Sequence, residues 1–472
     1  EDIVTGGTYG SRYEIPSEKT RQYIDYVQQL CCEWAKIFVD IVHKYGKKAM
    51  MFDGDHRIGT EPYNPYFKNI GLDAVVGAPH SGPYIRLLSD MEGIKYTEGR
   101  LNPYFFPNEC PSDELGVQYL TKNWNSEKRG LLKKSIDRIG FGGYLKLADT
   151  YPNFCNLIKN ISDEFRLIKE NTGKNGAYSH VKIAVISYWG RMYSWMMNGT
   201  FTDDIKPETE GYATFFNAIC GQPIDVKFVS FDEIMECQNL NQKFDVLVNT
   251  GLAGSAFQGD KYWANEKLLT KIREFVYNGG GFIGIGDPSG YHYQGKYFQL
   301  EDVLGVQKEI GFTYSKTKFF PQKDEKHWII SDLDLEQIHF GKQGLGVYPI
   351  NANVLCSSDS VFNPTTCLLT GGNVYLSTNK YGCGRSIFIS SLSDSPEAFR
   401  LVYKCLLWAA HKEDLYNKAF SSDSRTDCYY YPDLESYAIL NNSDQNIETV
   451  FFNIEGKSTL VSVKAHDITW IK

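Results

Sequence analysis

The sequence lacks the features typical of disulfide-rich, metal-binding, nucleic-acid-binding and membrane proteins. Its eleven cysteines include no C-x-x-C pair and none stands near a histidine at metal-ligand spacing, so neither a disulfide framework nor a metal site is predicted. Acidic residues outnumber basic ones and give a net charge of −8, which leaves no electrostatic case for a nucleic acid or an anionic membrane as partner. No apolar run reaches membrane-spanning length and no secretory signal pattern opens the sequence, so we expect reduced thiols and a cytoplasmic location.

The composition that is present is that of a globular protein. At 472 residues the chain is too long for one core and should hold two to four domains. Hydrophobic residues make up 42% and charged residues 22%, both ordinary values. Aromatic residues reach 14%, which is high. Sugar-binding proteins use aromatic faces against pyranose rings, but large α/β cores also absorb aromatic side chains, and composition alone favours the core.

Residues 1–172 repeat a strand–loop–helix unit about four times. Apolar residues at helical spacing predict a long helix over 18–45, which Gly46 ends as a C-cap. Polar residues gather after each short apolar run, so the prediction is an α/β fold that begins with a partial TIM barrel. Four units are half of a (β/α)8 barrel, and either the repeat closes differently or the other half precedes Glu1. The predicted strands are 49–52, 72–77, 94–97 (ending before Glu98) and 136–140, with later helices near 86–88, 122–132 and 152–170.

Residues 180–412 restart the pattern after a linker rich in Gly, Asn and Lys at 171–180. They predict a Rossmann-like or flavodoxin-like α/β domain with a structural or oligomerising role. The glycine-rich stretch 279–286 does not indicate a nucleotide loop, because its glycines precede and follow a strand and do not open a helix. The predicted strands are 181–187, 226–229, 245–249, 281–285 and 386–390, and the predicted helices are 268–277 and 397–410.

Residues 415–472 form the third region. Apolar and polar residues alternate there at period two between polar turns, a pattern typical of antiparallel strands. This region predicts a small C-terminal β-sandwich, and it carries no visible chemistry.

The clearest functional signal is the run Asp-Gly-Asp-His-Arg at 53–57, which directly follows the buried strand 49–52. Charge at the end of a buried strand is costly unless it is paired or used, and in a barrel that end holds the catalytic side chains. Asp55 is therefore the predicted centre of an active site. A loop cap paired with Arg57 is the structural alternative, and His56 suits an orienting role better than that of a base.

Four ordered strings around this run carry a family resemblance. They are K-K-A-M-M-F-x-G-D-H-x-I-G-T-E-P-Y (47–63), G-L-D-A-V-V-G (71–77), K-Y-T-E-G-R-x-x-P-Y-F-F-P (95–107) and D-R-I-G-x-G-G-Y-L (137–145). With these strings the chain resembles the galacto-N-biose/lacto-N-biose phosphorylase family, and the resemblance covers nearly its whole length. That family has a barrel, a Rossmann-like domain and β-domains, and its barrel has upstream strands. The resemblance therefore implies that this chain is N-terminally truncated.

The resemblance also implies an activity. Members are glycosyltransferases of the disaccharide phosphorylase type, which cleave a galactosyl-N-acetylhexosamine with inorganic phosphate as co-substrate. The products are α-galactose 1-phosphate and the free acceptor sugar, with inversion at the anomeric carbon, and no cofactor is implied. The family's general acid falls on Asp55, and its substrate and phosphate contacts fall on Arg100, Tyr104 and Phe106.

The residues agree with that chemistry. An inverting hydrolase needs two carboxylates about 6.5–9.5 Å apart, whereas phosphate dianion is already a nucleophile and needs no base. A phosphorylase needs one acid and a cationic cradle, and the planar fork of a guanidinium suits a phosphate. Asp55 and Arg100 meet this requirement, and His56 and Glu98 are the further predicted binding residues.

Two alternatives stay open. One is a β-galactosidase-type hydrolase in which Asp55 pairs with Glu98 or Glu61, and the other is a half-barrel that binds sugar without turnover. Structural roles also compete with functional ones, since Glu98 can pair with Arg100 and the aromatic run 104–106 can fill the core. The expected partners are a disaccharide and phosphate, together with a second copy of the chain or a missing N-terminal half-barrel.

Overall fold

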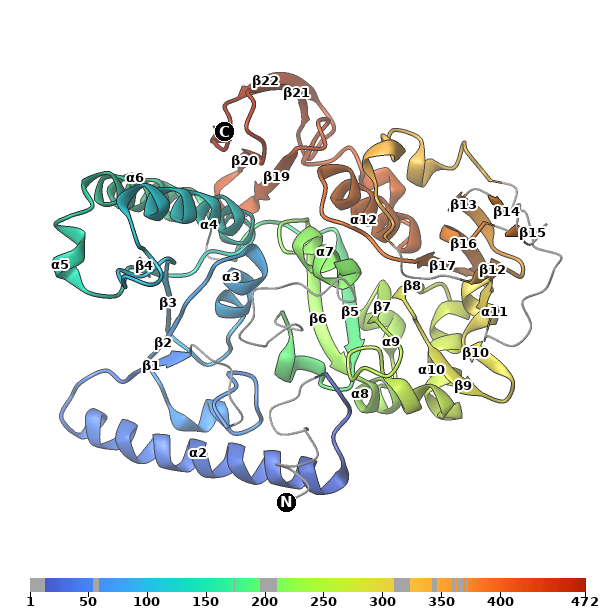
Figure 1. The fold of residues 1–472 in the computed structure, drawn as a ribbon, viewed down its shortest axis with the longest axis horizontal. Helices are drawn as coiled ribbons and strands as arrows, with labels where there is room; N and C mark the ends of the chain where they lie inside the picture. The colour runs from blue at the N-terminus through green and yellow to red at the C-terminus, as the bar shows by residue number, and fades with distance from the viewer. Residues whose placement is uncertain are drawn as a thin grey trace.

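The computed structural model describes residues 13–53, 59–173, 175–195, 210–309, 323–341, 346–358, 361–363, 368–370 and 372–472. The chain forms three regions in sequence order (Figure 1). A helix-covered sheet coloured blue to teal comes first, a larger central sheet coloured green to orange follows, and red C-terminal strands lie between these two regions at the top of the view.

The first region is a parallel sheet with strands in chain order, β1-β2-β3-β4. Helices follow the strands, as in a TIM barrel, and the four predicted strands are confirmed. The third strand corrects the sequence prediction: it runs on through Glu98 to Arg100, because these residues pair with Arg138–Gly140 of the next strand. The elements are α2 (Glu18–Lys44), β1 (Met50–Asp53), η1 (Phe67–Ile70), β2 (Ala74–Gly77), α3 (Gly82–Ser89), β3 (Tyr96–Arg100), α4 (Asp113–Lys133), β4 (Arg138–Gly140), α5 (Leu145–Ala148) and α6 (Pro152–Asn171).

The two faces of this sheet differ. Side chains alternate between faces along a strand. A Cβ added to Gly77 would lie 2.6 Å from Leu88 of α3, and one added to Gly99 would lie 2.8 Å from Ile136, so these glycines face the helical layer. The alternate positions of β1 and β3 therefore face the other way, and three large side chains there stay about half exposed: Met50 (55%), Phe52 (47%) and Tyr96 (49%).

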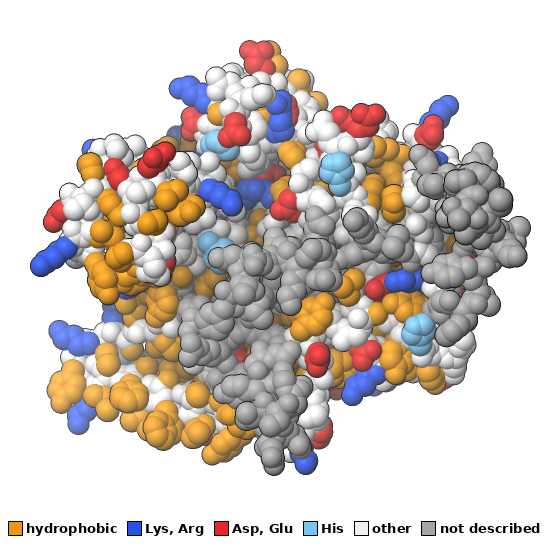
Figure 2. Space-filling model, in the orientation of Figure 1, with side chains coloured by type: hydrophobic (Ala, Val, Ile, Leu, Met, Phe, Trp, Pro, Cys, Tyr) orange, Lys and Arg blue, Asp and Glu red, His pale blue; other side chains and the backbone are white. Residues whose placement is uncertain are grey.

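Helix α2 carries apolar side chains on two faces. Ser17 caps its start by accepting a hydrogen bond from the Thr20 N–H at 3.2 Å. One face is buried around Ile24 and Cys32. Figure 2 shows hydrophobic side chains gathered along this helix at the lower left of the view, and those exposed by more than half are Tyr26, Trp34, Ile37, Phe38 and Ile41.

The central region is built on a seven-stranded sheet with the order β13-β16-β17-β8-β7-β5-β6. The five strands from β17 to β6 pair in parallel, and β16 and β13 are antiparallel. Gly281 and Gly284 lie inside β8, where an added Cβ would strike Ala409 of α12 and Pro288 respectively, so the glycine-rich stretch is a packed strand, as predicted. The strands are β5 (Val181–Ser187), β6 (Ile224–Ser230), β7 (Val246–Gly251), β8 (Gly281–Gly286), β13 (Asn353–Ser357), β16 (Val374–Tyr381) and β17 (Gly384–Ile389).

Short elements surround this sheet, and most of those between 290 and 381 were not predicted from the sequence. Strands of three or four residues pair there in two-stranded antiparallel sheets. The helices and short strands are η2 (Gly190–Tyr193), α7 (Glu210–Ile219), α8 (Phe231–Glu236), α9 (Leu240–Lys243), η4 (Asp260–Ala264), α10 (Glu266–Tyr277), β9 (Gly290–Tyr293), β10 (Lys296–Phe298), α11 (Glu301–Leu304), β11 (Val306–Lys308), η5 (Trp328–Ile330), η6 (Leu335–Gln337), β12 (Val347–Pro349), β14 (Val361–Asn363), β15 (Leu368–Thr370), α12 (Pro396–Ala409) and η7 (Glu413–Leu415).

The C-terminal region is a small β-sandwich, as predicted. Two three-stranded antiparallel sheets, β18-β21-β22 and β19-β20-β23, face each other across a cluster that includes Tyr437, Ile439 and Phe451. The elements are β18 (Phe420–Ser421), β19 (Thr426–Tyr431), η8 (Pro432–Leu434), β20 (Ser436–Asn441), β21 (Ile447–Phe452), β22 (Ser458–Val463) and β23 (Ile468–Ile471).

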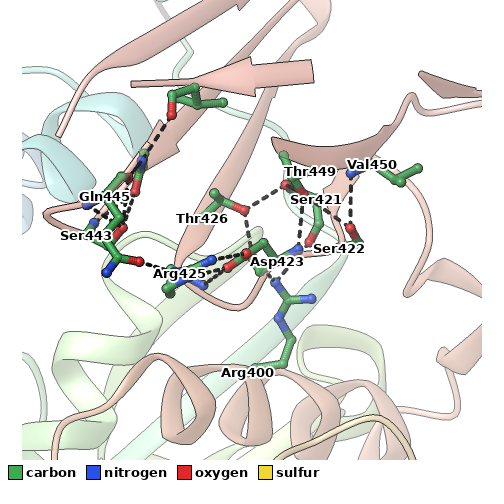
Figure 3. Close-up of polar contacts among 12 residues, drawn as sticks. Arg400, Ser421, Ser422, Asp423, Arg425, Thr426, Ser443, Gln445, Thr449 and Val450 are labelled. Carbon is green, nitrogen blue, oxygen red and sulfur yellow. Dashed lines mark hydrogen bonds and ion pairs between the residues drawn. The ribbon is translucent and has the colours of Figure 1, made fainter. Parts of the chain in front are cut away.

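Polar contacts fix the sandwich to both other regions. The Arg400 guanidinium of α12 donates to the carbonyls of Ser421 (2.9 Å) and Asp423 (3.0 Å), and Asp423 pairs with Arg425 (Figure 3). On the other side, Tyr431 donates its hydroxyl to the Leu132 carbonyl of α4 at 2.7 Å. The three regions therefore meet around α4 and α12.

Candidate functional site

The predicted site lies at the carboxyl ends of the parallel strands β1 to β4. Asp55 and His56, together with Arg57, lie outside the described residues. The other predicted residues stand on β3 and on the loop that follows it. Glu98 and Arg100 belong to the strand face that carries the half-exposed Tyr96, because they follow it at two-residue spacing.

Glu98 lies between two arginines. Its Oε2 is 2.9 Å from Nε of Arg138, and its Oε1 is 3.6 Å from Nε of Arg100. Glu98 is buried, whereas the side chains of Arg100 and Arg138 are 39% and 73% exposed. One carboxylate thus faces two guanidiniums, and the cluster keeps one net positive charge at a surface that a ligand can reach.

Arg138 was not predicted as a site residue. It stands in the string 137–145 that carries the family resemblance, so the sequence held the signal. Its role depends on the β3–β4 register, which sets it directly beside Glu98. That register joins residues 40 positions apart, and it was not visible in the spacing of either strand.

Arg100 also points towards the strand that leads to Asp55. Its guanidinium carbon lies 5.8 Å from the ring centroid of Phe52 on β1, two strands away. Phe52 precedes Asp55 by three residues in the sequence. The described geometry therefore brings Arg100 to the end of β1, the strand after which the predicted acid follows.

An aromatic group lies next to the arginines. Phe106 meets Tyr104 at 6.0 Å and Tyr144 at 5.1 Å between ring centroids, both edge to face, whereas Phe105 packs into the core against Phe154. Burial raises the pKa of Tyr104 to about 12, although Arg100 acts in the opposite direction. The Tyr104 hydroxyl is buried and has no hydrogen-bond partner in the described part of the chain.

Backbone contacts hold the two loops of this site together. Phe105 N–H donates to the Gly142 carbonyl at 2.9 Å, and Tyr144 N–H donates to the Phe105 carbonyl at 2.8 Å. Gly143 sits at φ +107°, and an added Cβ would lie 2.5 Å from the Phe105 nitrogen, so only glycine fits there. Two backbone hydrogen bonds therefore join the loop after β3 to the loop after β4.

Glu61, the other carboxylate considered for a hydrolase, is fully buried. Its carboxylate accepts hydrogen bonds from the Gly59 N–H (2.8 Å), the Tyr193 hydroxyl (2.8 Å) and the Gln28 amide (3.2 Å). Burial raises its pKa, although these hydrogen bonds oppose the shift. A carboxylate held in this way has no exposed oxygen to activate a water, so Glu61 fixes its loop to α2 and to the central region.

Among the described residues, no three His, Cys, Asp or Glu side chains lie close enough to hold a metal ion. None of the helices in that part of the chain has the length and apolar character needed to cross a membrane.

Family models match almost the whole chain in three consecutive segments. The lacto-N-biose phosphorylase N-terminal TIM barrel domain matches residues 1–180, the central domain of the same family matches 182–414, and its C-terminal domain matches 420–471.

Individual proteins agree with this result. A 1,3-beta-galactosyl-N-acetylhexosamine phosphorylase of Lachnoclostridium phytofermentans is 38% identical over 470 residues, which are 100% of this chain and 63% of that protein. A phosphorylase of the same name from Bifidobacterium longum subsp. longum is 34% identical over 502 residues, with 100% of this chain and 65% of that protein covered. The chain thus spans less than two thirds of the length of the curated relatives it matches.

One solved structure bears on the fold alone. A β-galactosidase from Rahnella sp. R3 matches with a TM-score of 0.50 at 13% identity, over 94% of this chain and 68% of that one. The likeness supports an α/β fold that begins with a TIM-barrel-like region and ends in β-rich regions.

Proposed function

Because the chain belongs to the lacto-N-biose phosphorylase family, we propose that the protein cleaves a β-galactosidic bond with inorganic phosphate. The products are α-galactose 1-phosphate and a free N-acetylhexosamine acceptor, and the anomeric carbon inverts. The observation that carries this proposal is the cluster in which Arg100 and Arg138 share one carboxylate, Glu98. Its surplus positive charge at a reachable surface suits a phosphate dianion.

Each residue then has a part in the reaction. Asp55 protonates the glycosidic oxygen as the acceptor sugar leaves, and His56 orients that acid. Phosphate, held by Arg100, attacks the anomeric carbon from the opposite face, which inverts its configuration. Because phosphate is already an anion, no side chain has to remove a proton from it.

The aromatic side chains and Glu98 complete the site. Tyr104 and Phe106 offer ring faces to the galactosyl unit, and Tyr144 supports Phe106. Glu98 holds the two arginines in place, since both of its oxygens face a guanidinium.

The hydrolase alternative is less well supported by this geometry. A second carboxylate must activate water, yet Glu61 is fully buried and satisfied by hydrogen bonds, and Glu98 is held between two arginines. Neither is placed as a free general base. The requirement for phosphate is the property that separates the two reactions.

We also propose that residues 1–172 are the C-terminal half of a (β/α)8 barrel. The described residues of this region form four parallel strands, and their non-helical face leaves Met50, Phe52 and Tyr96 about half exposed. In a closed barrel that face would be covered by side chains of the remaining strands. An N-terminal half-barrel or a second copy of the chain is the proposed cover, and the activity requires it.

The remaining regions are assigned on similar grounds. We infer a flavodoxin-like domain over 180–412, because its five parallel strands follow the order 2-1-3-4-5 when counted along the chain. A separate β-domain covers 415–472.

The ten cysteines in the described residues are free thiols, which supports a reducing, cytoplasmic location.

The proposal is tested by measuring product release from galactosyl-β-1,3-N-acetylglucosamine by the chain supplied with the proposed N-terminal half-barrel as a separate chain. In phosphate buffer, galactose 1-phosphate should appear in equimolar amount with N-acetylglucosamine, and proton NMR should show the α anomer at early times. Without phosphate, no cleavage is expected. Release of free galactose at the same rate in both buffers would show a hydrolase instead.

A further inference from the structure

A polar cavity lies at the N-terminal ends of the first region's strands, opposite the end that holds the proposed catalytic site. It has a volume of about 510 Å³ and is walled by the C-terminal ends of α3 and α4, by η2 and by β6. Asp90 and Glu92 precede β3, and Lys134 precedes β4, so these residues lie where the strands begin. Arg100 lies where β3 ends. The cavity is therefore separate from the proposed catalytic site.

Its wall carries more positive than negative side chains. Asp90 is the centre of the charged network: it accepts from Arg86 (3.2 Å), Lys134 (3.0 Å) and the Trp195 indole N–H (3.0 Å). Burial works against its ionisation, but the charges of Arg86 and Lys134 outweigh burial and hold the pKa of Asp90 below its usual value. The described cationic side chains in the wall are Arg86, Lys133, Lys134, Arg191 and Lys227, against the three acids Asp90, Glu92 and Asp225.

The three acids leave part of this charge uncompensated. Arg191 pairs with Glu92 at 2.7 Å, and Asp90 forms ion pairs with both Arg86 and Lys134. Lys133 is buried and donates to the Ala177 and Tyr178 carbonyls and the Ser179 hydroxyl, with no carboxylate among these partners. Burial, and then Arg86, lower its pKa well below the usual range, so Lys133 adds little charge to the cavity wall.

Polar groups around the cavity also lack partners. Nε of Arg86 and Oγ of Ser194 are buried without a hydrogen-bond partner among the described residues. Lys227 forms no ion pair with any residue in the described part of the chain, and it lies on β6, the end strand of the seven-stranded sheet. Five consecutive residues of β6, 224–228, line the cavity.

That run of five residues shows which part of β6 meets the cavity. Side chains alternate between the two faces of a strand, so five residues in a row can line one space only along the backbone edge. No described strand pairs with this edge. A free sheet edge presents backbone N–H groups and forms an anion-binding concavity.

We propose that this cavity is a second binding site, specific for a dianionic phosphate group. The basic side chains of the wall outnumber its acids even without Lys133, and the unpartnered Nε of Arg86 with the ammonium of Lys227 supplies charge-assisted hydrogen bonds. The volume is in the range of pockets that hold small organic ligands. The phosphate group comes either from inorganic phosphate or from a sugar phosphate, and both are probes for the test.

The test uses calorimetric titration of the full chain with inorganic phosphate and, separately, with galactose 1-phosphate. The catalytic-site variant Arg100→Ala is titrated beside the wild type, because it weakens phosphate binding at the catalytic cluster and leaves the cavity wall unchanged. Lys227→Ala and Lys134→Ala remove exposed ammonium groups of the cavity wall, and Lys146→Ala removes an exposed lysine of α5 as the matched control. All variants are compared with the wild type by thermal melting.

In the Arg100→Ala background, the phosphate site should remain. Adding Lys227→Ala or Lys134→Ala should weaken it about 10- to 100-fold, the usual effect of losing one charge-assisted hydrogen bond, whereas Lys146→Ala should change nothing. Tighter binding of galactose 1-phosphate would identify a sugar phosphate as the ligand, and equal binding would identify the free ion. Loss of all binding in Arg100→Ala, or unchanged binding in both cavity variants, would overturn the proposal.

Discussion

Arg129 of α4 and Asp427 of β19 form a buried ion pair that joins the first region to the last. Nε of Arg129 lies 2.5 Å from Oδ2 of Asp427 across 298 residues of sequence, and the same guanidinium donates to the Ala218 carbonyl of the central region at 3.1 Å. One side chain therefore contacts all three regions. Because these contacts fix the central region against α4, they also shape the polar cavity beside β6.

Substitution of Arg129 tests this junction. Arg129→Ala leaves the largely buried Asp427 carboxylate with only the Asn442 amide as a side-chain donor among the described residues, and breaking a buried pair costs about 3–5 kcal/mol of unfolding free energy. Urea unfolding followed by tryptophan fluorescence measures the loss. Lys36→Ala, which breaks the exposed Lys36–Asp40 pair, should cost only about 0–1 kcal/mol. The double variant Arg129→Met/Asp427→Leu should recover part of the loss, and an Arg129→Ala protein as stable as the wild type would contradict the assigned role.

Asp55→Asn should slow phosphorolysis of galactosyl-β-1,3-N-acetylglucosamine by about 10²–10⁴-fold, since the acceptor sugar then leaves without a proton. A galactoside with a 4-nitrophenyl leaving group should suffer much less, because a phenolate departs unaided. The comparison of the two substrates is made by initial rates at saturating phosphate, with the complementary half-barrel supplied as a separate chain. Equal losses on both substrates would assign Asp55 to the structure of its loop.

The two arginines around Glu98 should differ in a measurable way. Arg100→Ala should lower kcat about 10²–10³-fold and raise the KM for phosphate more than that for the galactoside. Arg100→Lys should recover only part of this loss, because an ammonium cannot bind two oxygens in one plane. Arg138→Ala serves as the comparison, since Arg138 is closer to Glu98 and more exposed. Equal changes in both KM values for Arg100→Ala would indicate a structural pair with Glu98.

Much of the fold follows from local patterns, and much of the site does not. The apolar runs at 181–187 and 281–285 predicted their strands because parallel strands are buried on both faces. The strand β3 was predicted too short, because Glu98 and Arg100 have the polarity of a loop and only the pairing with β4 extends it. Arg138 pairs with Glu98, which is 40 positions away in the sequence, and Arg129 pairs with Asp427, which is 298 positions away. No local spacing in the sequence encodes such contacts.

Glu127 of α4 predicts an unusual pH dependence of stability. Its carboxyl group is fully buried with no hydrogen-bond partner among the described residues, and burial raises its pKa well above the usual value. The folded protein therefore holds this proton more tightly than the unfolded chain. The stabilising effect is complete below the unfolded pKa of about 4.3 and is lost as the pH rises through the folded pKa.

Glu127→Gln isolates this effect. The variant should lose less unfolding free energy than the wild type between pH 5 and pH 8, because glutamine does not ionise. Guanidinium unfolding at closely spaced pH values gives the two curves, and their difference should grow with pH. Parallel curves would mean that Glu127 finds a partner for its charge.

The exposed apolar face of α2 predicts that the 472-residue chain associates when it is produced alone. Trp34 and Phe38 are 63% and 66% exposed, and no described strand pairs with the outer edges of β1 and β4. The double variant Trp34→Glu/Phe38→Glu should therefore shift the protein towards monomer in sedimentation velocity, with little change in melting temperature. Leu460→Glu is the matched control, because Leu460 is equally exposed (67%) but lies in the β-sandwich.

Activity should follow the same dependence if residues 1–172 are half of a barrel, because the strands that complete the sugar and phosphate sites would then come from another chain. Release of galactose 1-phosphate by the chain alone should be absent, or should rise with protein concentration if two copies close the barrel. Supplying the complementary half-barrel as a separate chain should restore it. A monodisperse monomer with full activity at every concentration would show that four units suffice, and the placement of Asp55 on a barrel rim would then be wrong.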